Sequence, residues 1–170
     1  CIRDSGNTLS VLIKNKLKIP EDNIGVLSGP NLSSEILMNK PATSLLSFKD
    51  IKKANYFRDN ISNEIFRIYS GSDVVGSEIG GSLKNIIAIG CGIIDKMQLG
   101  DNAKSAFISR GLREIVRFGT SFKAKEYTFY GLSGIGDLIA TCVSNLSRNW
   151  QFGYALASGE TLETVSYTHL

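Results

Sequence analysis

The sequence predicts an α/β region followed by an all-helical region. Short apolar runs of strand length fall in the first part of the chain, at residues 23–27, 43–48 and 65–69. Apolar residues at helical spacing lie between the last two, from Ile51 to Ile61, and strands alternating with helices indicate an α/β layer with a parallel component. After Val74 no further strand signal follows, so the rest of the chain is expected to be helical.

The first elements are bounded by clear end signals. A helix is expected within residues 1–20, where apolar and basic residues share a helical pattern until Pro20 stops it. The strand after it ends at the Ser-Gly-Pro of residues 28–30. Ser33 then begins a helix, because its hydroxyl can accept hydrogen bonds from free backbone N–H groups. The change of pattern near residues 70–76 predicts a domain boundary there.

The stretch from Gly76 to Arg117 opens as an apolar helix with an unusual content of small residues. Between its isoleucines and leucines stand Gly80, Gly81, Ala88, Gly90 and Gly92. Glycine inside a helix costs about 0.5–1 kcal/mol relative to alanine, so another backbone or a ligand is expected to approach closely. Because the helix is apolar nearly all round, we expect it to be buried.

Lys84 lies in the middle of this apolar helix. A lysine on a buried helix extends its ammonium group to solvent, forms an ion pair, or takes part in chemistry. The local pattern by itself leaves these alternatives open.

The composition is that of an ordinary globular protein and excludes several classes. The chain has 170 residues, of which 42% are hydrophobic and 21% charged, and its net charge of +3 is too small to favour nucleic-acid binding.

Arg110, Arg113 and Arg117 share one helical stripe, which we interpret as a solvated face. The 3 cysteines lack the spacing of a disulfide framework or a metal site and favour a reducing, cytoplasmic setting. We expect neither a membrane span, which needs an apolar run of ~18–20 residues, nor a signal peptide.

Several segments, in order along the chain, carry a resemblance to one family. They are VLSGPNLSSEI at 26–36, GSEIGGSLKN at 76–85, GDNAKSA at 100–106, GLSGIGDLIATC at 131–142 and NLSRNWQFG at 145–153. Their sequence and their separations resemble the NAD(P)-dependent glycerol-3-phosphate dehydrogenases over residues 1 to about 163. No single segment would be specific, but together they are.

The resemblance implies a fold and a domain layout. Residues 1–73 would be the later part of a Rossmann-like dinucleotide-binding domain, and residues 74–163 a helical substrate-binding and catalytic domain. The first βαβ unit, with the glycine-rich turn that receives the cofactor, is expected to be missing, so the chain alone is expected to be inactive. Residues 164–170, which include His169, depart from the pattern and are expected to be a non-native tail.

The resemblance also implies an activity and its residues. The reaction would interconvert dihydroxyacetone phosphate and sn-glycerol 3-phosphate with NAD or NADP, supplying phospholipid synthesis. Lys84 matches the catalytic acid/base lysine. The implied substrate-binding residues are Gly29, Asn31, Lys84, Asp137, Thr141, Ser147, Arg148 and Asn149, and the implied cofactor-binding residues are Ser33 and Arg148. A phosphorylated small molecule and a second copy of the chain are the expected partners; a metal, nucleic acid and membrane insertion are not expected.

Simpler interpretations exist for some of these residues. In the simpler interpretation, Asp137 is the N-cap of the helix that follows it and has no role in the reaction. Asn31 would likewise be a turn residue after Gly29 and Pro30 without a ligand. The glycines of residues 131–136 superficially match a dinucleotide-binding loop, but no strand is expected before them, and we reject that interpretation.

Two other functions fit the sequence less well. A related NAD(P)-dependent hydroxy-acid dehydrogenase is disfavoured because the Ser-Arg-Asn of residues 147–149 suits a phosphorylated substrate. A non-catalytic helical oligomerisation module would give no reason for Lys84, Asp137 and Arg148 to occur together.

Overall fold

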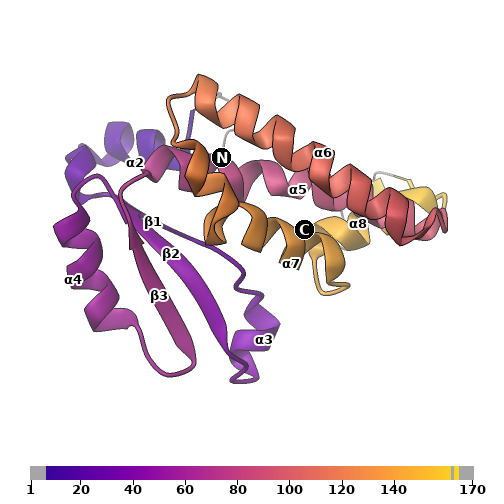
Figure 1. Cartoon of the computed structure of the whole chain (residues 1–170), viewed down its shortest axis with the longest axis horizontal. Coiled ribbons are helices and arrows are strands. Elements are labelled where there is room, and N and C mark those ends of the chain that lie inside the picture. Colours follow the sequence, from indigo (N-terminus) through magenta and orange to yellow (C-terminus); the bar gives the residue numbers. More distant parts are fainter. Residues whose placement is uncertain (1–6, 162, 165–170) are drawn as a thin grey trace.

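The structure is a computed structural model that describes residues 7–161 and 163–164. A small α/β region comes first and a larger helical region follows, and the two lie side by side (Figure 1). The predicted order of the two classes is therefore confirmed. The first residues of the helix expected within 1–20, and residues 165–170 with His169, lie outside the described residues.

The α/β region contains the strands and helices that the apolar runs predict, with small shifts at their ends. Its elements are α2 (Leu9–Leu17), the short 3₁₀ helix η1 (Glu21–Asn23), β1 (Gly25–Ser28), α3 (Ser33–Leu37), β2 (Ala42–Phe48), α4 (Ile51–Ile61) and β3 (Phe66–Gly71). The side chain of Asp50 caps α4 by accepting a hydrogen bond of 2.9 Å from the backbone N–H of Lys52.

The strands form one sheet in the order β1-β2-β3. β2 and β3 are parallel, with Ala42 opposite Phe66, which confirms the predicted parallel component. β1 is antiparallel to β2, with Gly25 opposite Phe48. The strand direction of β1 could not be taken from its apolar run, because a run of four or five residues has the same pattern in both directions.

The core of the α/β region is small. Leu46, Phe48 and Ile68 from the strands pack with Ala54 of α4. The helices α2 and α3 contribute no buried residue, and Leu37 at the end of α3 is 84% exposed. Among α2, α3 and α4, only α4 therefore contributes a buried residue to the core of this region.

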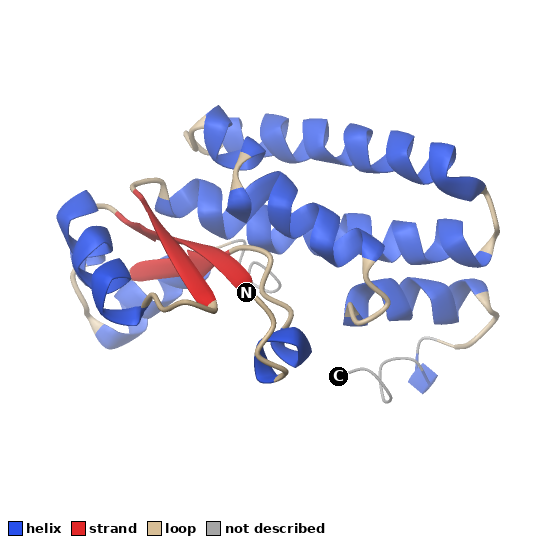
Figure 2. Cartoon of the chain, turned by 60° about the horizontal axis from the view of Figure 1, so that its bottom comes forward, coloured by secondary structure: helices blue, strands red, loops and turns tan. Residues whose placement is uncertain are grey.

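Six elements make up the helical region between residues 74 and 157. They are α5 (Val74–Lys96), α6 (Gly100–Ser121), the 3₁₀ helix η2 (Glu126–Tyr130), the π-helix η3 (Leu132–Gly136), α7 (Asp137–Val143) and α8 (Arg148–Ala157). Figure 2 shows α5 running between α6 and α8. No strand follows Gly71 among the described residues, as predicted.

Helix α5 is the central element of the molecule and begins at a well-satisfied cap. One carboxylate oxygen of Asp73 accepts from the backbone N–H of Gly76 at 3.0 Å. The other accepts from the N–H of Lys125 at 2.8 Å and from the hydroxyl of Thr128 at 2.7 Å. The residue that starts α5 therefore also fixes the segment leading into η2.

Two glycines let α5 and α8 cross at close range. A Cβ at Gly92 of α5 would overlap the carbonyl oxygen of Trp150, and a Cβ at Gly153 of α8 would overlap that of Ile89. These partners are backbone atoms, which cannot move aside as a flexible side chain can. The expectation of a close approach at the small residues of α5 is confirmed, and at Gly92 the approaching group is a backbone.

The helical core is larger than that of the sheet. It is formed by Ile79, Ala88, Cys91, Ile115, Ala124, Phe129, Leu138 and Cys142. At its edge the carboxylate of Asp95 joins three helices, since its Oδ2 accepts from Nζ of Lys104 at 2.6 Å and from Nε1 of Trp150 at 2.7 Å. Cys91 behaves as the small buried hydrophobe that the sequence predicts.

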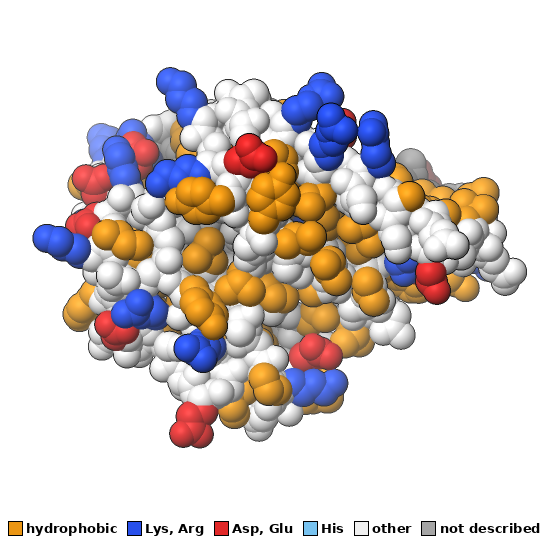
Figure 3. Space-filling model, viewed as in Figure 1, with side chains coloured by type: hydrophobic (Ala, Val, Ile, Leu, Met, Phe, Trp, Pro, Cys, Tyr) orange, Lys and Arg blue, Asp and Glu red, His pale blue; other side chains and the backbone are white. Residues whose placement is uncertain are grey.

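The surface over α6 is basic (Figure 3). Arg110, Arg113 and Arg117 are all exposed, and Nη1 of Arg117 lies 3.4 Å from a carboxylate oxygen of Glu114. The predicted solvated face is confirmed. None of the helices in the described part of the chain has the length and apolar character that crossing a membrane requires.

Candidate active site

Lys84 and Asp137 form an ion pair between α5 and α7. Nζ of Lys84 lies 2.5 Å from Oδ1 of Asp137, and the two side chains are 18% and 6% exposed. Of the alternatives open for Lys84, the structure therefore excludes simple extension into solvent. A short, largely dehydrated ammonium–carboxylate contact holds the lysine amine at a fixed point.

Asp137 does not cap its own helix. The N-cap position of α7 is Gly136, and no side chain accepts a cap hydrogen bond there. Asp137 is the first residue of α7, directly after the π-helix η3, and its carboxylate turns to Lys84. Single π-helical turns often occur at functional sites because they redirect the residues that follow.

Thr141 lies beside Asp137, as its position four residues later predicts. Its hydroxyl donates to the backbone carbonyl of Asp137 at 2.6 Å, and the hydroxyl oxygen lies 3.5 Å from Oδ1. Burial raises the pKa of the Asp137 carboxyl above its ordinary value, and the charge and hydrogen bond of Lys84 together with the Thr141 hydroxyl oppose this only in part.

The Ser-Arg-Asn triplet forms the start of α8. Ser147 is buried and caps this helix by accepting from the N–H of Trp150 at 3.3 Å, so its hydroxyl has a structural task. Arg148 is exposed, which leaves its guanidinium group accessible to a ligand. Asn149 donates from Nδ2 to Oδ1 of Asn85 at 2.9 Å.

Asn85 is a residue that the sequence reasoning missed. It follows Lys84 directly on α5, and its amide pairs with that of Asn149, so the first turn of α8 is joined to the helix that carries the lysine. Its position directly after Lys84, in the segment GSEIGGSLKN, was the signal that could have identified it. Its partner, 64 residues away in the chain, was not visible from spacing.

The loop after β1 reaches the same place from the sheet side. A Cβ at Gly136, next to Asp137, would lie 3.7 Å from the ring of Pro30. Gly29 has φ +153°, and a Cβ there would press on the backbone of Ser44 at 2.9 Å, so no larger residue fits. Nδ2 of Asn31 donates to the hydroxyl of Ser44 at 3.0 Å. Asn31 is therefore fixed against β2, and its predicted role as a ligand stays a prediction.

Ser33 lies one step further along this loop. It is the first residue of α3 and is exposed, while the N-cap position belongs to Leu32. The hydroxyl of Ser33 is thus accessible, as a cofactor-binding side chain must be, but it does not form the helix cap that its sequence position suggests.

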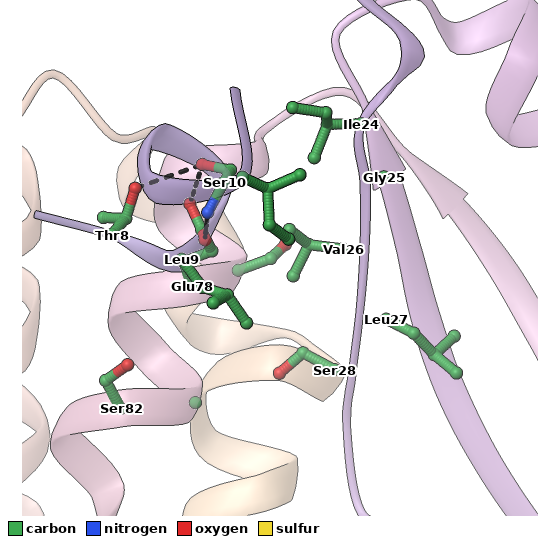
Figure 4. A pocket seen from close by; sticks show the side chains of 13 residues that line it. Thr8, Leu9, Ser10, Ile24, Gly25, Val26, Leu27, Ser28, Glu78 and Ser82 are labelled. Atoms are coloured by element: carbon green, nitrogen blue, oxygen red, sulfur yellow. Dashed lines mark hydrogen bonds between the residues drawn. The ribbon is translucent and has the colours of Figure 1, made fainter. Parts of the chain in front are cut away.

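A cavity of about 330 Å³ opens between α2, β1 and the first half of α5 (Figure 4). Glu78 of α5 lies on its wall, and its carboxylate accepts from the N–H of Ser10 at 2.7 Å and from the hydroxyl of Ser10 at 2.6 Å. Glu78 thereby satisfies the start of α2 from another helix. The carboxylate is engaged in this contact, so we do not assign it a role in acid–base chemistry.

The described residues contain no cluster of three or more histidine, cysteine, aspartate or glutamate side chains that could hold a metal. Cys91 and Cys142 are free, buried thiols, and their mutual hydrogen bond raises the pKa of Cys142 far above its ordinary value. Neither is a candidate nucleophile, because a reactive cysteine requires an accessible thiolate.

Family models and curated relatives match the chain along most of its length. Residues 2–54 match the N-terminus and residues 73–169 the C-terminus of NAD-dependent glycerol-3-phosphate dehydrogenase. The chain is 47% identical over 157 residues to a protein of Oceanobacillus iheyensis named glycerol-3-phosphate dehydrogenase (NAD(P)+), covering 92% of the chain and 46% of that protein. A protein of the same name from Nostoc sp. is 51% identical over 146 residues, covering 86% and 48%.

Solved structures show the same arrangement of elements. The crystal structure of glycerol-3-phosphate dehydrogenase from Coxiella burnetii has a TM-score of 0.81 and 39% identity, covering 85% of this chain and 44% of that one. The yeast glycerol-3-phosphate dehydrogenase has a TM-score of 0.82 and 29% identity, covering 94% and 48%. The chain thus spans about half the length of the relatives it matches. The expected fold class, the later part of a Rossmann-like α/β domain followed by a helical domain, is confirmed, and the chain belongs to the NAD-dependent glycerol-3-phosphate dehydrogenase family.

Proposed function

We propose that this chain carries the substrate half of an oxidoreductase that interconverts dihydroxyacetone phosphate and sn-glycerol 3-phosphate with NADH or NADPH. One observation carries the proposal: a largely buried lysine, paired with a buried carboxylate, lies where α5, α7 and the loop after β1 meet. A ketone reduction needs a proton donor at a fixed position, and a held ammonium group provides one.

In this proposal each residue of the site has a separate role. Lys84 donates a proton from Nζ to the ketone oxygen and takes it back in the reverse direction. Asp137 holds that amine in place. Arg148 binds the phosphate, because the fork of a guanidinium group contacts two phosphate oxygens at once. The amides of Asn149 and Asn85, already joined to each other, offer hydrogen bonds to the same substrate.

Only a few of the described residues are suited to bind the cofactor. The exposed Arg148 and the exposed Ser33 can donate to it, so these are the residues that would hold it. The glycines of residues 131–136 form no phosphate cradle, since a Cβ at Gly134 would overlap the backbone of Phe129, and a 3₁₀ helix rather than a strand precedes them. When bound, the nicotinamide supplies the hydride.

The test uses a protein of the relatives' full length that contains this chain. Lys84→Ala should lower the turnover number by roughly 10²–10⁴, the usual contribution of a positioned acid–base group. Lys96→Ala is the matched control, because Lys96 is an exposed lysine at the end of the same helix. Normal turnover of Lys84→Ala would remove Lys84 from the mechanism.

The phosphate assignment has its own test. Arg148→Leu should impair dihydroxyacetone phosphate roughly ten- to a hundredfold more than unphosphorylated dihydroxyacetone, as expected when a hydrogen bond to a charged group is lost. Arg113→Leu, an exposed arginine on α6, is the control. Equal losses on both substrates would favour a related hydroxy-acid dehydrogenase, and no turnover of dihydroxyacetone phosphate by the unmodified full-length protein would favour a non-catalytic module.

Two further proposals concern the cellular setting and the oligomeric state. We propose a cytoplasmic setting, which the free, buried thiols of Cys91 and Cys142 support. We also propose a homodimer, for which exposed apolar residues such as Ile139 and Val143 on α7 offer contact surface.

A further inference from the structure

Gly80 lies buried on α5, one helical turn before Lys84. A Cβ at this position would overlap the carbonyl oxygen of Ser133, and it would lie 3.3 Å from the Ser133 carbonyl carbon and 3.6 Å from Cα of Gly134. All three atoms are backbone atoms of the π-helix η3. The missing side chain of Gly80 therefore allows the backbone of η3 to lie directly on α5.

The same two segments carry the ion pair a few residues further on. Lys84 follows Gly80 by four residues on α5, which returns it to the same helix face. Asp137 follows Ser133 by the same number of residues. The backbone contact at Gly80 and the contact between Lys84 and Asp137 are thus consecutive points along one seam between α5 and the η3–α7 segment.

The η3 segment has little freedom to absorb a displacement. A Cβ at Gly134 would overlap the backbone of Phe129, whose side chain is fully buried. The N–H groups of Gly134 and Gly136 both bond the carbonyl of Gly131, at 3.2 and 3.1 Å. Because η3 is packed on both sides, a side chain at position 80 that displaces the η3 backbone should also displace Asp137, which follows η3 directly.

We propose that Gly80 is a positioning residue whose missing side chain sets the separation of Lys84 Nζ and Asp137 Oδ1. The geometric part of this inference concerns the ion pair alone. Its catalytic consequence rests on the proposed function, because only there does the position of the lysine amine control proton donation. Gly80 itself contacts no reacting atom.

The experiment measures how strongly Lys84 acts on Asp137 with and without the close contact. The pKa of Asp137 is followed by carboxyl ¹³C NMR in the chain, before and after Lys84→Met. Removal of the ammonium group should raise this pKa, since Lys84 lowers it. In a Gly80→Ala background the same Lys84→Met change should raise it by about half as much or less, as in a double-mutant cycle for a weakened contact.

Gly81→Ala is the matched control. It lies next to Gly80 on the same helix and gains the same helix propensity, but its Cβ would meet only the hydroxyl of Ser28, at 3.1 Å, which can rotate. In this background Lys84→Met should raise the pKa of Asp137 as much as in the unmodified chain. An undiminished effect of Lys84→Met in Gly80→Ala would show that Gly80 serves packing only.

A second measurement covers the case in which Gly80→Ala does not fold. In the unmodified chain a nuclear Overhauser contact between the Hα atoms of Gly80 and Gly134 is expected, because their backbones are this close. Its absence would overturn the inference without any variant.

Activity separates this inference from the proposed function. In the full-length protein Gly80→Ala should lower kcat roughly ten- to a hundredfold and change KM much less, as expected for a misplaced proton donor. If the NMR cycle behaves as expected while Lys84→Ala retains its turnover, the positioning role stands and the proposed reaction fails. If Lys84→Ala loses its turnover while the cycle shows no difference, only the role of Gly80 is wrong.

Discussion

The sheet region and the helical region bury their cores to different degrees. Among the described residues, the core of the sheet region has four buried apolar residues, three from the strands and Ala54 from α4, while the helical core has eight, grouped around α5. Leu27 on the edge strand β1 is 47% exposed, whereas Ile79 and Cys91 on α5 are at most 1% exposed. The helical region therefore has the larger buried core, and Lys84 and Asp137 both lie on its helices. The sheet supplies one loop to that site.

Paired phenylalanine substitutions should show the largest effect. Phe129→Ala removes a ring that is 0% exposed in the helical core and should lower the free energy of unfolding by about 3–5 kcal/mol. Phe48→Ala in the sheet core should cost less, about 2–3 kcal/mol, because Phe48 stacks on Phe57, which is itself partly exposed and can relax. Urea unfolding of both variants makes the comparison. A greater loss for Phe48→Ala would reverse the order of the two cores.

The second-largest loss of stability is expected when the ammonium group of Lys84 is removed. Lys84→Met leaves the carboxylate of Asp137 buried without its charged partner, at a cost of about 2–3 kcal/mol near neutral pH. The folded pKa of Asp137 is already raised, so the contribution of this carboxyl to stability is fully present below the ordinary carboxyl pKa near 4 and is lost as the pH rises through the raised value. In Lys84→Met the loss on raising the pH should be larger than in the unmodified chain.

Thermal unfolding between about pH 4 and 8 measures this pH dependence. The double variant Lys84→Met, Asp137→Asn is the control, since a neutral amide cannot ionise and should recover part of the stability at neutral pH. The same pH dependence in the single and the double variant would mean that another group is responsible.

A smaller effect is expected at the hydroxyl contact between the two regions. Ser47 of β2 and Ser77 of α5 lie 2.7 Å apart and are fully buried, and the hydroxyl of Ser77 donates to the carbonyl of Asp73 at 2.9 Å. Ser47 must then donate to Ser77. Ser77→Ala breaks two hydrogen bonds and should cost about 1–2 kcal/mol, against about 0.5–1 kcal/mol for Ser47→Ala. Chemical denaturation can resolve this difference, and equal costs would contradict the assigned donor direction.

The smallest change is expected at Ser133. Its hydroxyl is fully buried and has no hydrogen-bond partner among the described residues. Ser133→Ala removes an unsatisfied polar group, so it should leave the free energy of unfolding unchanged or raise it by up to about 1 kcal/mol. A clear loss of stability in calorimetry would show that the hydroxyl does have a partner in solution.

The sequence predicted what depends on local pattern. The helix from Ile51 to Ile61 was predicted with the bounds that the structure shows, because its apolar spacing is a local pattern. The approach of Lys84 and Asp137 followed from matching two distant motifs to one family, and periodicity alone left Lys84 undecided. What was missed depends on contacts between distant segments, such as the direction of β1 and the pairing of Asn85 with Asn149.

Ser147 and Ser33 show a further limit of sequence patterns. Both precede or begin a helix, and both carry the hydroxyl that a cap requires, yet only Ser147 forms one. Whether a hydroxyl accepts from a backbone N–H depends on the angle at which the chain enters the helix. That angle is set by tertiary contacts, which the residue types alone do not specify.

Trp150 gives the molecule an optical reporter of one region only. It is the single tryptophan of the chain, and its indole donates to Asp95 where α5 and α8 meet and stacks on Tyr154 at a ring-centre distance of 5.1 Å. Its fluorescence therefore records the opening of the helical region, whereas far-ultraviolet circular dichroism records both regions. Melting curves from the two signals in one sample would coincide if the chain unfolds as one unit, and would separate if the sheet opens first.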